Sequence, residues 1–297
     1  MFRADLMSGK RILVTGGGTG LGKAMAGRFL ELGASLVICG RRLGVCQEAA
    51  RELTDRHGGR VDVYGVDIRD ADAVERMVAD VFDGGPPLAG LVNNAAGNFI
   101  CPTESLSRRG FEAIAHIVMH GTFHVTQAVG KRWIAAGWRP GSPMRSVLSI
   151  IVTWVENGGP FVVPSTMSKA AVEAMTRSLA IEWARHGIRL NAVGPGEIPT
   201  EGMSARLSPG QEPGARQREQ NPMGRAGTTE ELANLATFLL SDGCDWLTGQ
   251  SIFMDGGLHL ATGGNFYELR HWTPERWRAA REAIATQDRK DREQRHG

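Results

Sequence analysis

A glycine-rich turn near the start of the chain holds the residues best suited to binding a ligand. Residues 15–22 read TGGGTGLG, a TGxxxGxG pattern between a strand-like run and a helical one. Glycines let the backbone turn sharply and approach a pyrophosphate, which the N-terminus of the next helix attracts. An ordinary turn is the alternative, but this context favours a nucleotide site. The residues expected to contact the nucleotide are Gly16, Gly18, Thr19, Gly20 and Leu21.

Two arginines indicate which nucleotide this turn binds. The next predicted strand ends in Cys39-Gly40-Arg41-Arg42. Proteins that bind NAD place a carboxylate about 20 residues after the glycines to hold the ribose hydroxyls. Arg41 and Arg42 stand there instead, and guanidinium groups suit the 2′-phosphate of NADP(H). A solvated surface pair is the alternative; we expect NADP(H) as the cofactor.

A serine, a lysine and three histidines are further candidates for chemistry. Ser165 lies four residues before Lys169, which places both on one face of a helix. His116, His120 and His124 have the same spacing. No carboxylate of the HExxH type accompanies them, so we expect no metal site. For His120, a packed structural role and a functional role both remain open.

Short apolar runs alternate with helical patterns, which predicts a parallel sheet covered by helices on both faces. The predicted strands are 11–15, 35–39, 61–66, 88–92, 146–152, 188–193 and 251–254. The predicted helices follow the glycine turn and then cover 44–57, 71–82, 109–137, 166–185 and 230–240. We expect one α/β domain, a Rossmann-type doubly wound parallel sheet, over residues 8–260. Residues 261–297 form a C-terminal extension, with a short helix from Thr273 and a charged tail.

Composition excludes several classes of protein. The 297 residues include 34 Lys and Arg against 32 Asp and Glu, and this balance argues against nucleic-acid binding. No apolar run reaches about 18 residues, so we expect no membrane span. The four cysteines show no paired spacing, which indicates a reducing compartment without disulfides. With no signal peptide at the N-terminus, a cytoplasmic protein is expected.

Four motifs in one order carry a family resemblance. They are the glycine pattern, Asp67 after the third strand, Asn-Asn-Ala-Ala-Gly at 93–97 after the fourth, and Pro195-Gly196 after the sixth. Over residues 8–260 the chain resembles the short-chain dehydrogenase/reductase family. Residues 94–104, 161–165 and 230–235 look like those of the 2,4-dienoyl-CoA reductases within it. The start just before the first strand, without a transit peptide, suggests a bacterial relative.

The resemblance implies roles for individual residues. Those expected to hold NADP(H), besides the glycine turn and the two arginines, are Asp67, Ile68, Asn93, Lys169, Pro195, Gly196 and Ile198. Those expected to contact an acyl-CoA substrate are Arg69, Phe99, Ser107 and Arg206. Arginine suits the phosphates of CoA, although Arg69 and Arg206 as plain surface charges are the alternative. A homo-oligomer, a tetramer built through the two long helices, is expected from the family.

The catalytic positions depart from the common family pattern. Most members carry a tyrosine where Ser165 stands, and a serine hydroxyl is too weak an acid to replace it in carbonyl reduction. The dienoyl-CoA reductases share this serine and use an asparagine and a tyrosine to stabilise the thioester oxygen. Asn98 matches the asparagine, but Trp154 occupies the tyrosine position. An indole N–H donates a hydrogen bond and releases no proton at neutral pH. Water or His120 would then supply the proton.

Three functions remain open from the sequence. The first is an NADPH-dependent reductase of unsaturated acyl-CoA thioesters, which Asn98, Lys169 and the two arginines favour. The second is an oxidoreductase of the same family acting on another substrate, with Trp154 reshaping the pocket. The third is a non-catalytic NADP(H)-binding protein, which Trp154 favours because the family tyrosine is missing.

Overall fold

The computed structural model describes residues 1–200, 212, 214–261 and 267–282, which belong to two compact units. The first unit is Met1–His259 and contains the whole sheet; the second is Leu260–Gly297. In the second unit, η5 (Tyr267–His271) and residues 274–282 are helical, and Thr273 precedes the latter as expected. Among the described helices, none has the length and apolar character needed to cross a bilayer.

The first unit is built on a seven-stranded parallel sheet with the strand order β3-β2-β1-β4-β5-β6-β7. Its strands are β1 (Arg11–Thr15), β2 (Ser35–Gly40), β3 (Val61–Gly65), β4 (Gly90–Asn93), β5 (Arg145–Ile150), β6 (Ile188–Pro195) and β7 (Ser251–Met254). The order reverses direction between β1 and β4, and ligands of open α/β sheets bind at the carboxyl ends of the strands beside such a switch point. Every pair is parallel, so those carboxyl ends lie at one edge.

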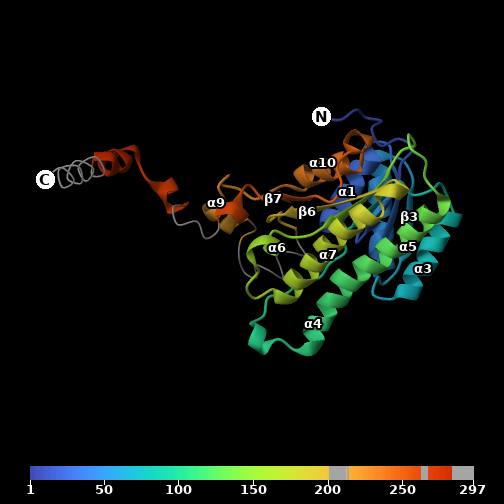
Figure 1. Ribbon diagram of the computed structural model, residues 1–297, viewed down its shortest axis with the longest axis horizontal. Coiled ribbons are helices and arrows are strands. Elements are labelled where there is room, and N and C mark those ends of the chain that lie inside the picture. Colours follow the sequence, from blue (N-terminus) through green and yellow to red (C-terminus); the bar gives the residue numbers. More distant parts are fainter. Residues whose placement is uncertain (201–211, 213, 262–266, 283–297) are drawn as a thin grey trace. The chain divides into compact units, whose positions relative to one another are not determined.

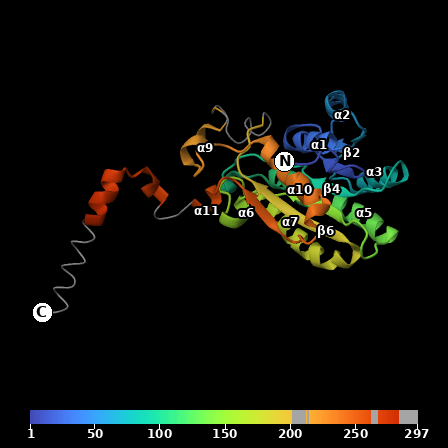
Figure 2. The ribbon, with the colours of Figure 1, turned by 90° about the horizontal axis from the view of Figure 1, so that it is seen from above.

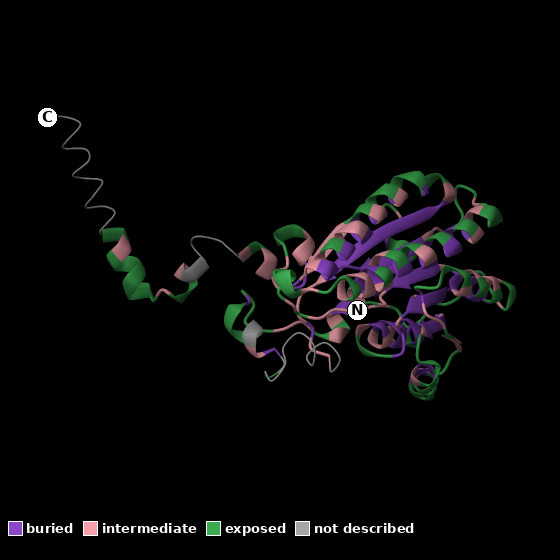
Figure 3. Cartoon of the chain, turned by 90° about the horizontal axis from the view of Figure 1, so that it is seen from below, coloured by how far each residue is buried: buried purple, intermediate pink, exposed green. Residues whose placement is uncertain are grey.

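Helices cover both faces of this sheet (Figure 1). One core cluster joins the sheet to α1 (Gly20–Glu31), α2 (Leu43–His57) and α10 (Thr229–Leu240). The other joins it to α3 (Ala71–Asp83), α5 (Gly121–Ala136) and α7 (Val163–Glu182). The five central strands are buried between layers of helices whose outer sides are exposed, whereas the edge strands β3 and β7 are half-buried (Figure 3). This confirms the expected Rossmann-type fold.

Two helix boundaries differ from the prediction for identifiable reasons. The long helix expected over 109–137 consists of α4 (Arg108–Ala115), the π-helical segment η2 (His116–His120) and α5. α7 begins at Val163 and not at residue 166, because Pro164 occupies its first turn, where a missing N–H costs no hydrogen bond. The remaining short elements are η1 (Thr103–Ser105), α6 (Trp154–Asn157), η3 (Ala184–His186), α9 (Ala215–Gln220), η4 (Asp242–Cys244) and α11 (Leu258–Ala261).

Two buried arginines tie down the amino-terminal edge of the sheet. Arg11 opens β1, forms an ion pair with Asp62 at 2.8 Å and donates to the Val81 carbonyl at 2.6 Å. Arg189, the second residue of β6, donates to the Leu239 and Ser241 carbonyls, both at 3.1 Å. Their charges are therefore committed to structure at the edge opposite the strands' carboxyl ends.

Candidate active site

The glycine turn directly precedes α1, which is labelled in the view from above (Figure 2). The turn is packed too closely for side chains. Gly16 adopts φ +65° and its N–H donates to the Cys39 carbonyl at 2.8 Å. A Cβ on Gly22 would lie 2.4 Å from the Gly16 carbonyl oxygen, and one on Gly17 would lie 2.7 Å from Ile38. Glycine is therefore required at these positions by contacts within the turn itself.

Thr15 and Asn94 fix the turn against the next loop. The Asn94 Nδ2 donates to the Thr15 carbonyl at 3.0 Å and to the Gly16 carbonyl at 3.3 Å. The Thr15 hydroxyl accepts from the backbone N–H groups of Asn94 and Ala95, both at 3.0 Å. Sequence reasoning missed both side chains as positioning residues, although they stand within the quoted motifs; a threonine and an asparagine placed directly after neighbouring strands were the available signal.

The N-terminus of α1 is open to an anion. Thr19 is the N-cap, its hydroxyl makes no capping hydrogen bond, and the first turn of the helix carries no acidic residue. Thr19 and Gly20 are both exposed. The backbone N–H groups at this helix N-terminus lie beside the glycine turn, where few side chains obstruct a ligand. They fit the pyrophosphate of a dinucleotide.

Arg41 and Arg42 follow β2 at the same edge. Both are exposed, and neither forms an ion pair within the part of the chain that the structure describes. Asp67, after β3, is bound by Arg69, whose Nε and Nη2 lie 2.9 and 2.5 Å from Oδ2. These hydrogen bonds hold the pKa of the Asp67 carboxyl below its usual range, with a smaller contribution from the charge of Arg41. The structure thus pairs Asp67, which is expected to hold NADP(H), with Arg69, which is expected to contact the acyl-CoA.

Ile68 lies between these two charged residues and turns inward. It is buried, and a Cβ on Gly121 would lie 2.6 Å from its side chain. The Ile68 carbonyl lies 3.1 Å from Nδ1 of His124. The loop that carries Asp67 and Arg69 is therefore anchored on the first turn of α5.

Asn93 ends β4 with its side chain buried in the sheet. Its Nδ2 donates to the hydroxyls of Thr126 at 2.8 Å and Ser149 at 3.4 Å. Its Oδ1 is buried and accepts no hydrogen bond from any residue that the structure describes. A buried acceptor without a partner is unusual and marks a place where a donor from a ligand or water would be accommodated.

Ser165 and Lys169 lie on the buried face of α7, as their spacing predicted, and are 3% and 5% exposed. The Lys169 Nζ donates to the carbonyl of Ile150, the last residue of β5. Burial lowers the pKa of Lys169 to about 8, because the ammonium loses its hydration. Since one carbonyl is the only partner of this ammonium among the described residues, two of its N–H groups remain for a ligand.

Asn98 lies in the loop between β4 and α4. Its Oδ1 accepts from the Phe99 N–H at 2.9 Å, which leaves Nδ2 as a donor. A Cβ on Gly110 of α4 would lie 3.2 Å from the Phe99 ring, so this ring packs close to that helix. Ser107 is the N-cap of α4, and its hydroxyl accepts from the Gly110 N–H at 3.1 Å. The expected substrate contact of Ser107 stays a prediction beside this capping role.

Trp154 and His120 differ in how far they are buried. Trp154 opens α6, is half-buried, and its Nε1 makes no hydrogen bond to the described residues. His120 ends η2 and is exposed, with its ring centroid 5.2 Å from that of His116 and 6.3 Å from that of His124. Among the described residues, no group of three or more His, Cys, Asp or Glu side chains is arranged to hold a metal.

The segment after β6 packs closely on the end of β7. The Gly196 N–H donates to the Met254 carbonyl at 2.9 Å, and a Cβ on Gly196 would lie 2.6 Å from the Cβ of Asp255. Pro195 ends β6, and Ile198 is buried. Arg206 lies outside the described residues.

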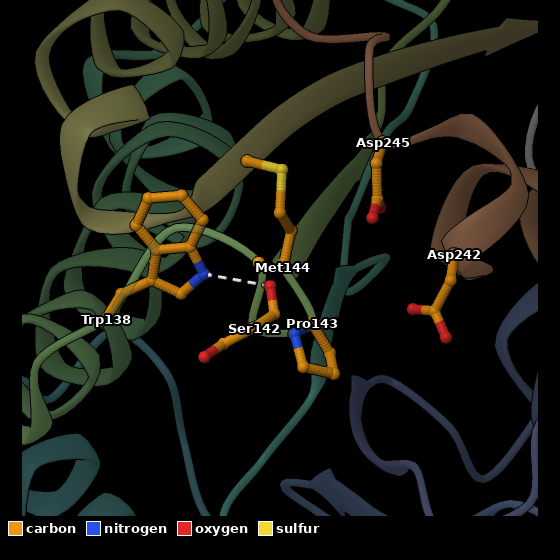
Figure 4. Close-up of a pocket in the computed structure, with 7 residues that line it drawn as sticks. Trp138, Ser142, Pro143, Met144, Asp242 and Asp245 are labelled. Atoms are coloured by element: carbon orange, nitrogen blue, oxygen red, sulfur yellow. Dashed lines mark hydrogen bonds between the residues drawn. The ribbon is translucent and has the colours of Figure 1, made fainter.

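A pocket of about 380 Å³ lies away from these residues (Figure 4). Its lining comes from segment 138–144, just before β5, and from Asp242 and Asp245. Asp242 pairs with Lys10 at 2.5 Å and Asp245 with Arg189 at 3.3 Å. It therefore belongs to the amino-terminal edge of the sheet, and its carboxylates already have cations beside them.

Comparisons with known proteins agree with this geometry. A family model described as "Enoyl-(Acyl carrier protein) reductase" matches residues 16–259. A Caenorhabditis elegans protein named probable 2,4-dienoyl-CoA reductase 3, (3E)-enoyl-CoA-producing, is 43% identical over 93% of this chain and 90% of its own length. The chain belongs to the short-chain dehydrogenase/reductase family. It is an oxidoreductase related to the 2,4-dienoyl-CoA reductases.

Two further relatives of this dehydrogenase/reductase extend the comparison. A Bacillus subtilis protein named probable 2,4-dienoyl-CoA reductase, (2E)-enoyl-CoA-producing, is 38% identical over 86% of this chain and 98% of its own. A crystal structure of a gluconate 5-dehydrogenase from Burkholderia cenocepacia, in complex with NADP and tartrate, aligns with a TM-score of 0.78. Its identity is 30%, over 86% of this chain and 98% of that one. The family uses a nicotinamide cofactor, and the open turn before α1 fits one.

Proposed function

We propose that this protein reduces 2,4-dienoyl-CoA thioesters with NADPH. The observation that carries the proposal is the buried pair Ser165 and Lys169, which has a lysine but no acidic phenol beside it. A serine hydroxyl cannot protonate the oxygen formed in carbonyl reduction, so reduction of a conjugated C=C bond is favoured. The relatives named as 2,4-dienoyl-CoA reductases support the same substrate.

Residues 8–260 would form the NADP-binding domain. The glycine turn and the N-terminus of α1 would hold the pyrophosphate, and Arg41 and Arg42 the 2′-phosphate. Lys169 would donate to the nicotinamide ribose, with the segment from Pro195 to Ile198 alongside. NADPH, when bound, supplies the hydride, which the far end of the diene receives. Two exposed guanidiniums, neither of which forms an ion pair with a described residue, support NADPH over NADH.

Asn98 would stabilise the charge that develops on the thioester oxygen. Its Nδ2 is the group that remains available, because Oδ1 is engaged by the Phe99 N–H. A fixed donor aimed at such an oxygen contributes several kcal/mol to catalysis. Arg69 and Arg206 would meet the phosphates of CoA; Arg69 would then exchange its present ion pair with Asp67 for the ligand.

The position of protonation decides the product. Hydride addition at C5 of the diene gives a dienolate, which yields a (3E)-enoyl-CoA when protonated at C2 and a (2E)-enoyl-CoA when protonated at C4. Trp154 offers no proton, and a dienolate protonated by water reacts fastest at C2, beside the carbonyl. We therefore expect the (3E) product, as in the name of the Caenorhabditis elegans relative.

One observation favours a second candidate function. Trp154 fills the tyrosine position with a larger, half-buried ring, which would suit a different substrate in the same site or a protein that binds NADP(H) without turnover. Turnover separates these two alternatives: an enzyme for a different substrate oxidises NADPH when that substrate is present, whereas a binding protein does not.

We also propose a homotetramer built through α5 and α7. Phe123 on α5 and Met167 and Ile181 on α7 are 45%, 55% and 83% exposed, and such large apolar side chains favour burial against a partner. Light scattering after size-exclusion chromatography tests this, and a monomer at micromolar concentration would contradict it.

The decisive experiment follows NADPH oxidation at 340 nm with 2,4-hexadienoyl-CoA, 2-hexenoyl-CoA and a simple ketone, and identifies the product by NMR. We expect turnover of the dienoyl-CoA alone and a (3E) double bond. Turnover of the ketone alone would overturn the proposal. NADPH binding by calorimetry without turnover of any substrate would favour the binding protein.

A further inference from the structure

Phe161 is held in a conformation that side chains rarely adopt. Its φ is +65°, and among the described residues it is the non-glycine residue with positive φ. A bulky aromatic residue in this left-handed region is a genuine outlier, because its Cβ crowds the backbone. The ring is nevertheless 59% exposed.

A single hydrogen bond connects this residue to the loop of Asn98. The Cys101 N–H donates to the Phe161 carbonyl at 2.8 Å. Two residues after Phe161 the helix α7 begins, with Ser165 in its first turns. Phe161 thus joins the two segments that bring the thioester donor and the Ser165–Lys169 pair to the carboxyl edge of the sheet.

Folding alone does not account for a phenylalanine here. A largely exposed ring removes little apolar surface from water, so it offsets little of the cost of the left-handed backbone. Glycine would adopt the same backbone without strain. Strained residues of this kind cluster at ligand-binding sites, which indicates that the Phe161 ring contacts a ligand.

A second exposed apolar residue stands next to Cys101, the residue that donates this hydrogen bond. Ile100 directly precedes Cys101 and is 50% exposed, whereas the ring of Phe99 packs on α4 at Gly110. Ile100 and Phe161 are two exposed apolar residues on backbone segments that the Cys101–Phe161 hydrogen bond joins. We call this pair the apolar rim.

We propose that the apolar rim receives the hydrocarbon chain of the substrate beyond the reacting diene, and that Phe161 sets the preference for chain length. The inference rests on the proposed function, since it assumes an acyl-CoA with its thioester at Asn98. A chain of six carbons ends one methyl group beyond the diene, whereas a chain of ten carries four more methylenes that need apolar surface.

The test compares 2,4-decadienoyl-CoA with 2,4-hexadienoyl-CoA in the NADPH-loaded enzyme. Phe161→Gly removes the ring and the strain, Phe161→Ala removes the ring and keeps the strain, and Phe238→Ala is the control, an exposed ring on α10. In both Phe161 variants we expect the ratio of kcat/KM for the long to the short substrate to fall about tenfold. The control keeps the parent's ratio. Phe161→Gly alone raises Tm, by about 2–4 °C.

Several outcomes separate the two proposals. A parent enzyme that reduces hexadienoyl-CoA, with an unchanged ratio in both Phe161 variants, overturns the rim. If the parent reduces neither dienoyl-CoA, the proposed function fails, and calorimetric binding of decanoyl-CoA and hexanoyl-CoA then decides the rim by itself. If the ratio of the affinities for decanoyl-CoA and hexanoyl-CoA is the same in the parent and in Phe161→Ala, the binding experiment also overturns the apolar rim. A higher Tm in Phe161→Gly with a lower chain-length ratio would show that the strain serves the ligand.

Discussion

Two regions of the site are built by different means: residues 11–97, which include the glycine turn and the two arginines (the cofactor half), and residues 98–198, which include Asn98 and the Ser165–Lys169 pair (the substrate half). In the cofactor half, backbone amides, glycines and one asparagine–threonine network fix the geometry. In the substrate half, the proposed function depends on single side chains such as Asn98, Trp154 and Phe161. The first half therefore resembles the family in its backbone path, whereas the second half differs from other family members in its side chains.

The largest expected effect tests Lys169, which serves both halves. We expect Lys169→Met to lower kcat/KM for dienoyl-CoA about 1,000-fold, because the buried donor to the ribose is lost. Removal of a buried cation leaves the fold intact, so Tm should not fall. The exposed Lys131→Met, which breaks only an ion pair with Glu75, is the matched control. Equal activity in both variants would refute the role of Lys169.

Asn98→Ala is expected to have the next largest effect, within the substrate half alone. Loss of one donor to the thioester oxygen lowers kcat by about 100- to 1,000-fold, while the Kd for NADPH stays as in the parent. Steady-state kinetics and a fluorescence titration of NADPH measure the two. Asn157→Ala, in α6, controls for loss of an asparagine near the site. A variant as active as the parent would show that the thioester oxygen lies elsewhere.

Arg41→Asp probes the cofactor half through a side chain. Loss of a charge-assisted contact to the 2′-phosphate should raise KM for NADPH by about 10- to 100-fold and lower KM for NADH. Arg51→Asp, an exposed arginine on α2, makes the same charge change elsewhere. An NADH preference in the unmodified protein would contradict the assignment to NADPH.

A pH titration separates catalysis from stability at Lys169. Burial lowers its pKa from 10.5 to about 8, so above pH 8 the folded protein loses the ammonium. We expect kcat/KM to fall about tenfold per pH unit there. Between pH 8 and 10.5 the unfolded state binds the additional proton, so this group makes the protein more stable as pH rises. Lys169→Met should abolish both slopes; a parent profile that is flat up to pH 10 would exclude a titrating Lys169.

Trp154→Tyr is expected to have the smallest effect. A phenol at this position restores a donor and an acid, so activity should be equal to the parent's or a few-fold higher. A change of product from the (3E) to the (2E) isomer would place the phenol beside C4. A large loss of activity would show that the indole shapes the substrate half, which would bring the site closer to the second candidate function.

Much of the fold follows from the sequence because its causes are local. The alternation of apolar runs and helical patterns gave every strand of the sheet to within a few residues, and the glycine spacing predicted a turn whose tightness the Gly22 contacts confirm. The spacing of Ser165 and Lys169 likewise placed both on one buried helix face. Because the strands are parallel, the segments that follow their carboxyl ends all lie at one edge of the sheet.

The remainder depends on contacts between distant segments. The left-handed Phe161 is held by Cys101, sixty residues earlier, and no local pattern distinguishes it from an ordinary loop residue. The spacing of His120 gave its helical neighbours, while its exposure depends on how the helix packs. The Asp67–Arg69 pair likewise arises from the loop geometry after β3.

The π-helical segment η2 is a point at which the chain can lose a residue without disturbing either half. One wide turn is equivalent to an extra residue inserted into an α-helix, and it absorbs that residue without changing the faces that the flanking helices present. α5 packs on α3 and β4, whereas α4 packs on α7 and on Phe99 through Gly110. Deletion of one residue within 116–120 would therefore restore a regular helix and leave both sets of contacts in place. Only the turn that carries His116 and His120 would be rebuilt.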